Sequence, residues 1–340
     1  MNIGRHFIRY CLSAMACFTL AAAPALAADD GARAAADDTL RKWKAAGHAR
    51  PIVETHIHFW QVTRPGGVPW PTPAEGPIYR DVLPPEYSAL AKPNGVVRAG
   101  IVEASGIVED NQWILDLVEG DKFYSFFVGN LEIGAPTFAD DLERFARDRR
   151  FVGIRGYLSG PAEGITLSPE QLASLNDLAH RGMPLDIISR GTKNPKDLVL
   201  ALCTAVPDLR IIIDHLGGAK GPPPVDPTWE LEIRRIADAC PNLYMKFSSF
   251  YDMYAPGDVV FPSPTDLGSY KAHFDVLMTA FGPDRLIWGS NWPVITLHGS
   301  FENQIAIAEE YLAPFGTKVR DKVMARNALM FYRRHGRGNN

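Results

Sequence analysis

The chain has 340 residues, of which 46% are hydrophobic, 22% charged and 10% aromatic. This balance is typical of a packed globular protein and excludes intrinsic disorder, collagen and coiled coil. The formal net charge of −4 provides no basic field for nucleic acid or for an anionic membrane surface, so neither is expected as a partner. Four cysteines are too few for a disulfide-built scaffold, and they show no CxxC spacing.

The first 27 residues are predicted to be a secretory signal peptide. Basic residues precede an apolar run over residues 10–23, which is shorter than the roughly 20 residues that a membrane span needs. Ala25 and Ala27 form an A-x-A type cleavage site, so cleavage is expected after Ala27. The mature protein is therefore expected to be periplasmic or secreted, with no membrane partner once the signal is removed.

Two cysteines remain after the predicted cleavage. Cys11 and Cys17 lie within the signal peptide, whereas Cys203 and Cys240 belong to the mature chain. Both of the latter fall within predicted helices. We expect buried free thiols rather than a disulfide, although an oxidising compartment permits the bond.

A polar leader over residues 28–50 is followed by one domain, predicted over 51–335. Short β-branched or apolar runs alternate there with helical patterns. We predict eight strands, at residues 52–58, 97–103, 124–130, 152–157, 185–189, 209–215, 243–248 and 285–290. Helices are expected between them, at residues 110–119, 137–148, 168–181, 194–206, 229–239 and 269–281.

Eight strands that alternate with helices predict a parallel sheet closed into a single (β/α)8 barrel, the TIM-barrel fold. A doubly wound open sheet is the alternative. That fold is normally marked by a glycine-rich phosphate loop after an early strand, and no predicted strand here ends in one. The barrel is therefore favoured.

A long proline-rich loop follows the first strand. Residues 60–93 contain eight prolines and connect the first two strands over more than thirty residues. Segments of this kind are usually functional lids or disordered inserts. The large apolar rings of Trp60, Trp70 and Tyr79 favour an ordered lid. Since it leaves the carboxyl end of a barrel strand, it is expected to lie over the mouth where barrel enzymes keep their active sites.

The first strand ends in Glu54-Thr55-His56-Ile57-His58, in which Glu54, His56 and His58 share one face because strand side chains alternate. Two imidazoles at a barrel mouth can bind one divalent cation, or polarise a carbonyl without a metal. The alternative is a pair of hydrogen-bonded structural histidines. Their position at the end of the first strand favours the site.

The sixth strand ends in a polar pair, Asp214 and His215, after an apolar run. Buried polar groups are costly unless they are used. His215 is a candidate third metal ligand or a group that polarises the substrate. Asp214 either orients a neighbouring histidine or caps the chain turn that follows.

Several segments together resemble the amidohydrolase-2 family of barrel hydrolases, in its fuconolactonase-like and 2-pyrone-4,6-dicarboxylate-lactonase-like branch. The resemblance covers roughly residues 51–334. It implies a (β/α)8 barrel that opens lactones, or more broadly hydrolyses C–O or C–N bonds, with zero or one divalent metal. It rests on HIHFW at 56–60, FVGIR at 151–155, IDHLGG at 213–218, PNLYMKFS at 241–248, the block at 273–294 that ends in WGSNWPV, and NALMFYRR at 327–334.

The resemblance also assigns site residues and shows one departure. The family's H-x-H pair matches His56 and His58, its sixth-strand histidine matches His215, and its fourth-strand arginine matches Arg155. The family's eighth-strand acid, a general base and sometimes a metal ligand, falls at Asn291. A carboxamide cannot accept the proton of a water nucleophile at neutral pH.

Three explanations of this departure stay open. Another carboxylate near a strand end, Glu103, Asp186 or Asp252, is the base. Alternatively Asn291 only orients water or substrate, while a metal-bound hydroxide or His215 does the chemistry. In the third, the protein is a non-catalytic binder on an enzyme scaffold.

Further candidates for substrate binding lie at other strand ends. Arg155 and Arg190 can hold a carboxylate or an acyl oxygen by bidentate contact, with surface ion pairing as the alternative. Glu103, Trp60 and Tyr251 complete the predicted substrate-binding set, although aromatic residues in such positions are more often part of the core. Lys246 lies within the seventh strand, and its direction is not decided by the sequence.

Together these observations predict an exported hydrolase that opens a small lactone or related cyclic ester, with water as the nucleophile. The predicted catalytic residues are His56, His58, His215 and Asn291, and the three histidines would hold one divalent ion, zinc or manganese, with a metal-free site as the alternative. A metal-dependent non-oxidative decarboxylase, or a non-catalytic binder of a sugar acid or aromatic acid, are the competing functions. The expected partner is a small-molecule substrate, and a homo-oligomer is left open.

Overall fold

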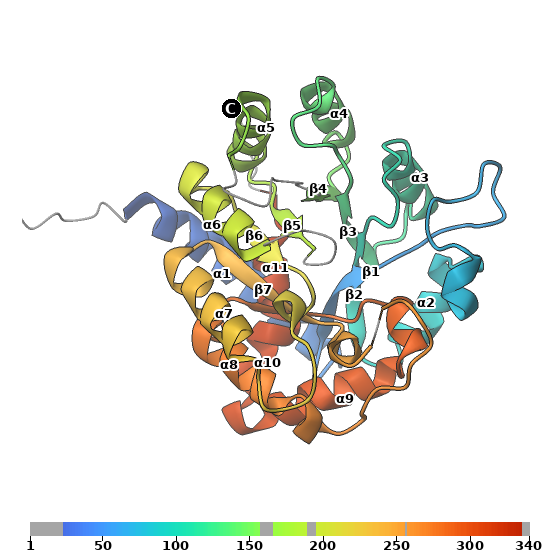
Figure 1. Cartoon of the computed structure of the whole chain (residues 1–340), viewed down its shortest axis with the longest axis vertical. Coiled ribbons are helices and arrows are strands. Elements are labelled where there is room, and N and C mark those ends of the chain that lie inside the picture. Colours follow the sequence, from blue (N-terminus) through green and yellow to red (C-terminus); the bar gives the residue numbers. More distant parts are fainter. Residues whose placement is uncertain (1–22, 157–165, 189–194, 256, 335–340) are drawn as a thin grey trace, which may run out of the picture.

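Eight parallel strands form the centre of the molecule (Figure 1). The computed structural model describes residues 23–156, 166–188, 195–255 and 257–334. Neighbours in the sheet follow the chain in the order β1 to β8, with helices between them, so the predicted single (β/α)8 barrel is confirmed. The strands are β1 (Ile52–Ile57), β2 (Val96–Val102), β3 (Tyr124–Gly129), β4 (Phe151–Gly156), β5 (Leu185–Ile187), β6 (Ile211–Ile213), β7 (Leu243–Ser248) and β8 (Leu286–Gly289).

The barrel closes between β1 and the segment that follows β8. Ile57 forms a parallel bridge with Trp292. The amide of His58 donates to the Trp292 carbonyl over 2.9 Å, and the amide of Asn291 donates to the His56 carbonyl over 2.8 Å. The closing seam therefore brings the first-strand histidines beside Asn291, although more than 230 residues separate them in sequence.

The Glu54 carboxylate holds this seam together. Its Oε1 atom accepts hydrogen bonds from the backbone amides of His56 and Ser290, each over 2.8 Å. Its Oε2 atom accepts one from the Tyr87 hydroxyl over 3.2 Å. Burial raises the pKa of Glu54 to about 7, although the hydrogen bonds favour the charged form.

The predicted helices are present with boundaries that differ by a few residues. Two begin with side-chain caps: Ser168 shares a capping box with Gln171, and Asp226 accepts from the Thr228 amide. These helices, α3 (Asp110–Leu117), α4 (Phe138–Phe145), α5 (Pro169–His180), α6 (Pro195–Ala205), α7 (Pro227–Ala239) and α8 (Lys271–Phe281), surround the sheet.

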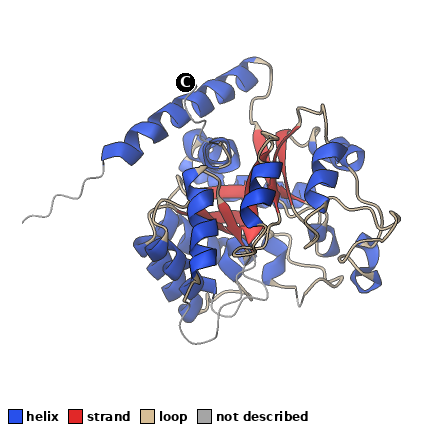
Figure 2. Ribbon diagram, turned by 90° about the horizontal axis from the view of Figure 1, so that it is seen from above, coloured by secondary structure: helices blue, strands red, loops and turns tan. Residues whose placement is uncertain are grey.

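Further helices lie outside the predicted βα units: α2 (Pro84–Ala91), α9 (Phe301–Leu312), α10 (Thr317–Asp321) and α11 (Asn327–Phe331). The longest is α1 (Ala23–Ala45), which extends along one side of the molecule (Figure 2). It runs through the predicted cleavage site after Ala27, while residues 1–22 lie outside the described part of the chain. No helix in the described ranges is long and apolar enough to cross a membrane.

The barrel interior is filled by one apolar side chain from each of several strands. Five of these side chains are fully buried and belong to one cluster: Val53, Val102, Val128, Ile212 and Ile287. Residues of α1 and of the C-terminal helices close this cluster at the amino-terminal end of the strands. They are Leu40, Ala325, Ala328, Phe331 and Tyr332.

Cys203 in α6 and Cys240 at the end of α7 form a disulfide, with Cα atoms 5.8 Å apart. The expectation of free thiols is wrong. The two helices are neighbours on the outside of the barrel, and their packing brings together cysteines that are 37 residues apart in the chain. Predicting each helix separately gives no information about this contact.

A buried ion pair ties the C-terminal helices to the start of the barrel. Arg320 of α10 is buried and donates to Glu309 over 2.6 Å and to the Pro51 carbonyl, directly before β1, over 2.7 Å. Glu309 also pairs with Arg50. Burial by itself raises the pKa of Glu309, but the hydrogen bonds from both arginines outweigh burial and the pKa is lowered.

Replacing this carboxylate by its amide, Glu309→Gln, is expected to reduce the free energy of unfolding near neutral pH by about 2 kcal/mol, because hydrogen bonds to charged partners are lost. A carboxyl group whose pKa falls on folding stabilises the protein above its unfolded pKa, 4.5, and this stabilisation is lost as the pH falls through the folded value. Urea denaturation of wild type and variant should therefore converge in acid. The exposed neighbour Glu310→Gln is the control, and an equal loss there would contradict the prediction.

Candidate active site

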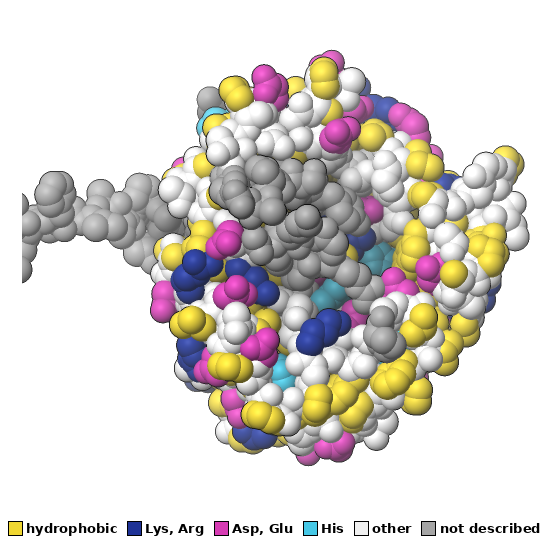
Figure 3. Space-filling view, in the orientation of Figure 1, with side chains coloured by type: hydrophobic (Ala, Val, Ile, Leu, Met, Phe, Trp, Pro, Cys, Tyr) yellow, Lys and Arg dark blue, Asp and Glu magenta, His cyan; other side chains and the backbone are white. Residues whose placement is uncertain are grey.

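A cavity of about 520 Å³ opens at the carboxyl ends of the strands. Histidine side chains are visible in the hollow at the centre of this face (Figure 3). The position is the one expected for a barrel enzyme, because the loops after each strand meet there. Its walls include His58, Glu103, Arg155, His215, Asp252 and Asn291, which follow or end six different strands.

His56 is fully buried at the centre of the histidine cluster. Its ring centroid lies 4.9 Å from that of His58 and 4.5 Å from that of His215. The Lys246 Nζ atom is 3.2 Å from Nδ1, and the Arg155 Nη1 atom is 3.5 Å from Nε2. Burial, followed by these positive neighbours, lowers the pKa of His56 well below its usual value. These surroundings favour the neutral imidazole, whose one lone pair can accept from Lys246 or Arg155 or bind a metal.

His58 lies between two hydrogen-bond acceptors. Its Nδ1 atom is 3.0 Å from the Val102 carbonyl, and its Nε2 atom is 3.2 Å from the Oδ1 atom of Asn291. A neutral imidazole has one N–H group and can donate to only one of these two oxygens. Burial and the charge of Arg155 lower the pKa of His58 to about 3. Asn291 is fixed on its other side by Ser249, whose Oγ atom accepts from Nδ2 over 2.8 Å.

Three residues of the site have backbone conformations that L-amino acids seldom adopt. His215, Ser249 and Asn291 follow β6, β7 and β8, and their φ angles are 54°, 54° and 71°. Left-handed backbone costs about 1–3 kcal/mol at such residues and is concentrated at functional sites. Asparagine tolerates this region better than most side chains, so Asn291 fits its backbone position.

Lys246 points into the barrel beneath the histidines. Its Nζ atom lies 2.6 Å from Asp186 and 3.0 Å from Asp214, and Asp186 also accepts from the Tyr332 hydroxyl over 2.8 Å. Burial favours neutral lysine, but the two carboxylates outweigh it and raise the pKa of Lys246, so the ammonium stays charged. Burial raises the pKa of Asp186 to about 6. The sequence pattern did not reveal this network, because it could not decide the direction of the lysine.

The Arg155 guanidinium is fixed by Glu103. Its Nε atom donates to Oε1 and its Nη2 atom to the backbone carbonyl of Glu103, both over 2.6 Å. Its Nη1 atom turns toward the histidines and lies 3.9 Å from Asp214. Arg155 and Glu103, both predicted to bind substrate, line the cavity.

The other predicted substrate-binding residues are placed differently. Trp60 is buried and donates from Nε1 to the Arg80 carbonyl over 2.8 Å, and Trp70 of the same proline-rich loop lines the cavity instead. Tyr251 is buried with its hydroxyl donating to the Ser300 carbonyl over 3.0 Å, and it is not part of the cavity wall. Arg190 lies outside the described residues.

Comparison with known proteins agrees with this geometry. Residues 53–334 match the amidohydrolase family model. The chain belongs to the amidohydrolase family. An L-fucono-1,5-lactonase of Burkholderia ambifaria is 31% identical over 293 residues, which are 83% of this chain and 95% of the relative.

Solved amidohydrolase structures share the barrel. An amidohydrolase from Burkholderia multivorans with bound zinc has a TM-score of 0.70 and 21% identity, covering 84% of this chain and all of its own. A candidate 2-pyrone-4,6-dicarboxylic acid hydrolase from Pseudomonas putida has a TM-score of 0.64 and 18% identity, covering 83% of this chain and 98% of its own. The expected family and its lactonase-like branch are confirmed, and the protein is a hydrolase of this family.

In this amidohydrolase, His56, Asp214 and His215 offer ligand atoms that lie within 4.8 Å of one another. The Oδ2 atom of Asp214 is buried without a hydrogen-bond partner in the described part of the chain. Neutral imidazoles with one carboxylate form a donor set that suits zinc or manganese. The residues therefore fit a divalent metal, and the cluster contains His56 and His215 of the predicted set together with Asp214.

Removing one of these donors is expected to reduce metal binding. After incubation with zinc and dialysis, wild type should retain about one zinc per chain, and His215→Gln should retain at least tenfold less, because a three-donor site loses a ligand. Metal content is measured by atomic emission on the whole chain. The exposed histidine of His48→Gln is the control, and equal zinc in the His215→Gln protein would contradict the assignment.

Proposed function

We propose that this amidohydrolase opens a small lactone or related cyclic ester, with a sugar lactone as the first candidate substrate. The observation that carries the proposal is the convergence of His58, His215 and the Arg155 guanidinium on one cavity of about 520 Å³. This volume suits a ligand of monosaccharide size. The L-fucono-1,5-lactonase relative, 31% identical over 83% of this chain, supports the same class of reaction.

The proposed reaction forms a tetrahedral intermediate when water attacks the ester carbonyl. Arg155 is held by Glu103 with one edge toward the histidines, so it can stabilise the developing oxyanion or bind a substrate carboxylate. His56, Asp214 and His215 would hold a divalent ion, which would supply Lewis acidity toward the carbonyl. His58, which lines the cavity outside this donor set, would hydrogen-bond water or substrate.

We propose that a carboxylate from another strand end is the general base, since the eighth-strand residue is Asn291. Asp186 lies beneath Lys246 and Tyr332 and is absent from the cavity wall, and Glu103 is bound to Arg155. Asp252 lines the cavity directly after β7, 3.9 Å from the His298 ring. We infer that Asp252 takes the proton from water.

Asn291 has a different part in this proposal. Its carboxamide sits between His58 and Ser249 on the cavity wall, which allows it to orient water or substrate by hydrogen bonds. It cannot take a proton, since the amide is not basic at neutral pH. The proposed base, Asp252, thus follows β7, and the orienting group, Asn291, follows β8.

The lactonase proposal is tested by acid release from a panel of sugar lactones that begins with L-fucono-1,5-lactone. Asp252→Asn is expected to lower kcat by roughly 10² to 10⁴, the usual contribution of a general base, while KM changes little. Asp258→Asn, at another carboxylate of the same wall, is the matched control and should keep most of the activity.

Other outcomes would overturn the proposal. Full activity of the Asp252→Asn protein would exclude this base. A wild type that opens no lactone while Asn291→Asp gains activity would show a binder on an enzyme scaffold. Carbon dioxide release from aromatic acids without lactone hydrolysis would favour a decarboxylase.

We also propose that the protein is exported to the periplasm or secreted. The amino-terminal sequence has the form of a signal peptide, and the Cys203–Cys240 disulfide is of a kind that forms and persists in oxidising compartments. The signal-like sequence and the disulfide lie in different parts of the chain.

Fractionation of the native host and mass spectrometry of the purified protein test the export proposal. The expected chain begins at residue 28, is recovered outside the cytoplasm and loses one disulfide only after reduction. A cytoplasmic chain that retains its first residues and has reduced thiols would overturn the proposal. Reduction alone should destabilise the protein by roughly 3–4 kcal/mol in thermal or urea unfolding, since the bond closes a loop of 37 residues.

A further inference from the structure

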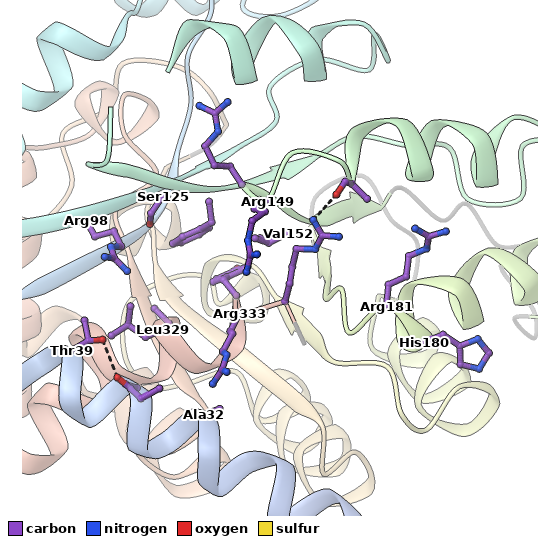
Figure 4. Close-up of a pocket in the computed structure, with 18 of the residues that line it drawn as sticks. Ala32, Thr39, Arg98, Ser125, Arg149, Val152, His180, Arg181, Leu329 and Arg333 are labelled. Atoms are coloured by element: carbon purple, nitrogen blue, oxygen red, sulfur yellow. Dashed lines mark hydrogen bonds between the residues drawn. The ribbon is translucent and has the colours of Figure 1, made fainter. Parts of the chain in front are cut away.

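A second cavity, of about 900 Å³, lies at the opposite end of the barrel from the histidines. Arg98 and Val152 contribute to it from the first halves of β2 and β4, whereas Glu103 and Arg155, beyond or near the ends of the same strands, line the histidine cavity. Helix α1 forms one wall with small side chains, among them Ala32. Figure 4 shows this cavity and the residues around it.

Arginines dominate the lining of this basic cavity. They come from a barrel strand, from the loop before β4, from the end of α5 and from the C-terminal segment, so the folded chain assembles them from distant positions (Figure 4). Glu143 is the one carboxylate among the residues that line it. The arginines are Arg98, Arg149, Arg150, Arg181, Arg333 and Arg334. A chain with a net charge of −4 therefore concentrates positive charge at one place.

Some of this charge is balanced within the protein. Arg181 pairs with Glu143 and with Asp177, over 2.7 and 2.8 Å, and Arg150 pairs with Asp148 over 2.6 Å. The other four arginines of the cavity form no ion pair with a carboxylate of the described residues.

The remaining arginines have other surroundings. Arg98 stacks over the Trp43 ring at 5.0 Å, and Arg334 donates to the carbonyls of Ala146 and Asp148. Burial, and then the like charges of Arg149 and Arg181, lower the pKa of Arg334. For Arg98, Arg149 and Arg333, no described carboxylate lies within ion-pair distance. Three guanidinium groups of the cavity therefore have no carboxylate partner among the described residues.

We propose that this basic cavity binds a small polyanion that carries at least two phosphate or carboxylate groups. Guanidinium groups recognise both groups by paired hydrogen bonds, and a bound polyanion removes the repulsion between neighbouring arginines. The volume of about 900 Å³ is in the range of small-molecule sites. One anionic group would contact Arg98, and another would contact Arg149 and Arg333. The site is independent of the proposed lactonase chemistry.

Calorimetric titration of the whole chain with inorganic pyrophosphate and, separately, with citrate tests this proposal at low salt. At least one probe should bind with a dissociation constant of roughly 100 μM or tighter, and the tighter probe identifies the preferred group. Arg149→Gln and Arg333→Gln should each weaken that binding by roughly tenfold, because each removes one charge-assisted pair. Arg147→Gln, on the same loop but outside the cavity lining, is the matched control and should bind as wild type does.

Three results would overturn the proposal. The first is that neither probe binds. The second is that the control variant loses as much affinity as the cavity variants, which would indicate a diffuse charge effect. The third is that binding is lost in Arg155→Met and retained in Arg149→Gln, which would place the anion among the histidines. Thermal unfolding of every variant without probe separates loss of binding from loss of fold.

Discussion

The arrangement of the site depends on one buried charge, the Lys246 ammonium. Two carboxylates, Asp186 and Asp214, surround it inside the barrel, and His56 lies 3.2 Å away. An unpaired charge at this depth would cost several kcal/mol, so each member of the group requires the others. If Asp214 turned away, Lys246 would lose one of its two carboxylate partners, and this interaction holds Asp214 beside the histidines.

The closing seam of the barrel supplies the second constraint. Glu54 binds backbone amides on both sides of the seam, and the amide of Asn291 donates to the His56 carbonyl. The same hydrogen bonds that close the sheet therefore set the distance between the first-strand histidines and the eighth-strand residue. The geometry of the candidate site and the closure of the barrel thus depend on the same hydrogen bonds, which explains why polar residues are tolerated at this point of the core.

The two ends of the barrel differ in how their charged side chains are arranged. At the carboxyl end, positive and negative groups are interleaved, with Arg155 against Glu103 and Lys246 between two aspartates. At the amino end, arginines gather with few carboxylates. Tyr332 lines the basic cavity, and its hydroxyl donates to Asp186 in the network beneath the histidines, so this residue contacts both regions.

The sequence by itself determined the barrel, its strands and most of the cavity residues, because period, strand count and polar strand ends are local properties. His58, His215, Arg155, Glu103 and Asn291 were found in this way. Only the tertiary structure decided the direction of Lys246, the place of Asp214 beside His56 and His215, the replacement of Trp60 by Trp70 at the wall, and the Cys203–Cys240 bond. Each of these depends on which side a side chain faces or which helices are neighbours, and packing between distant segments settles both.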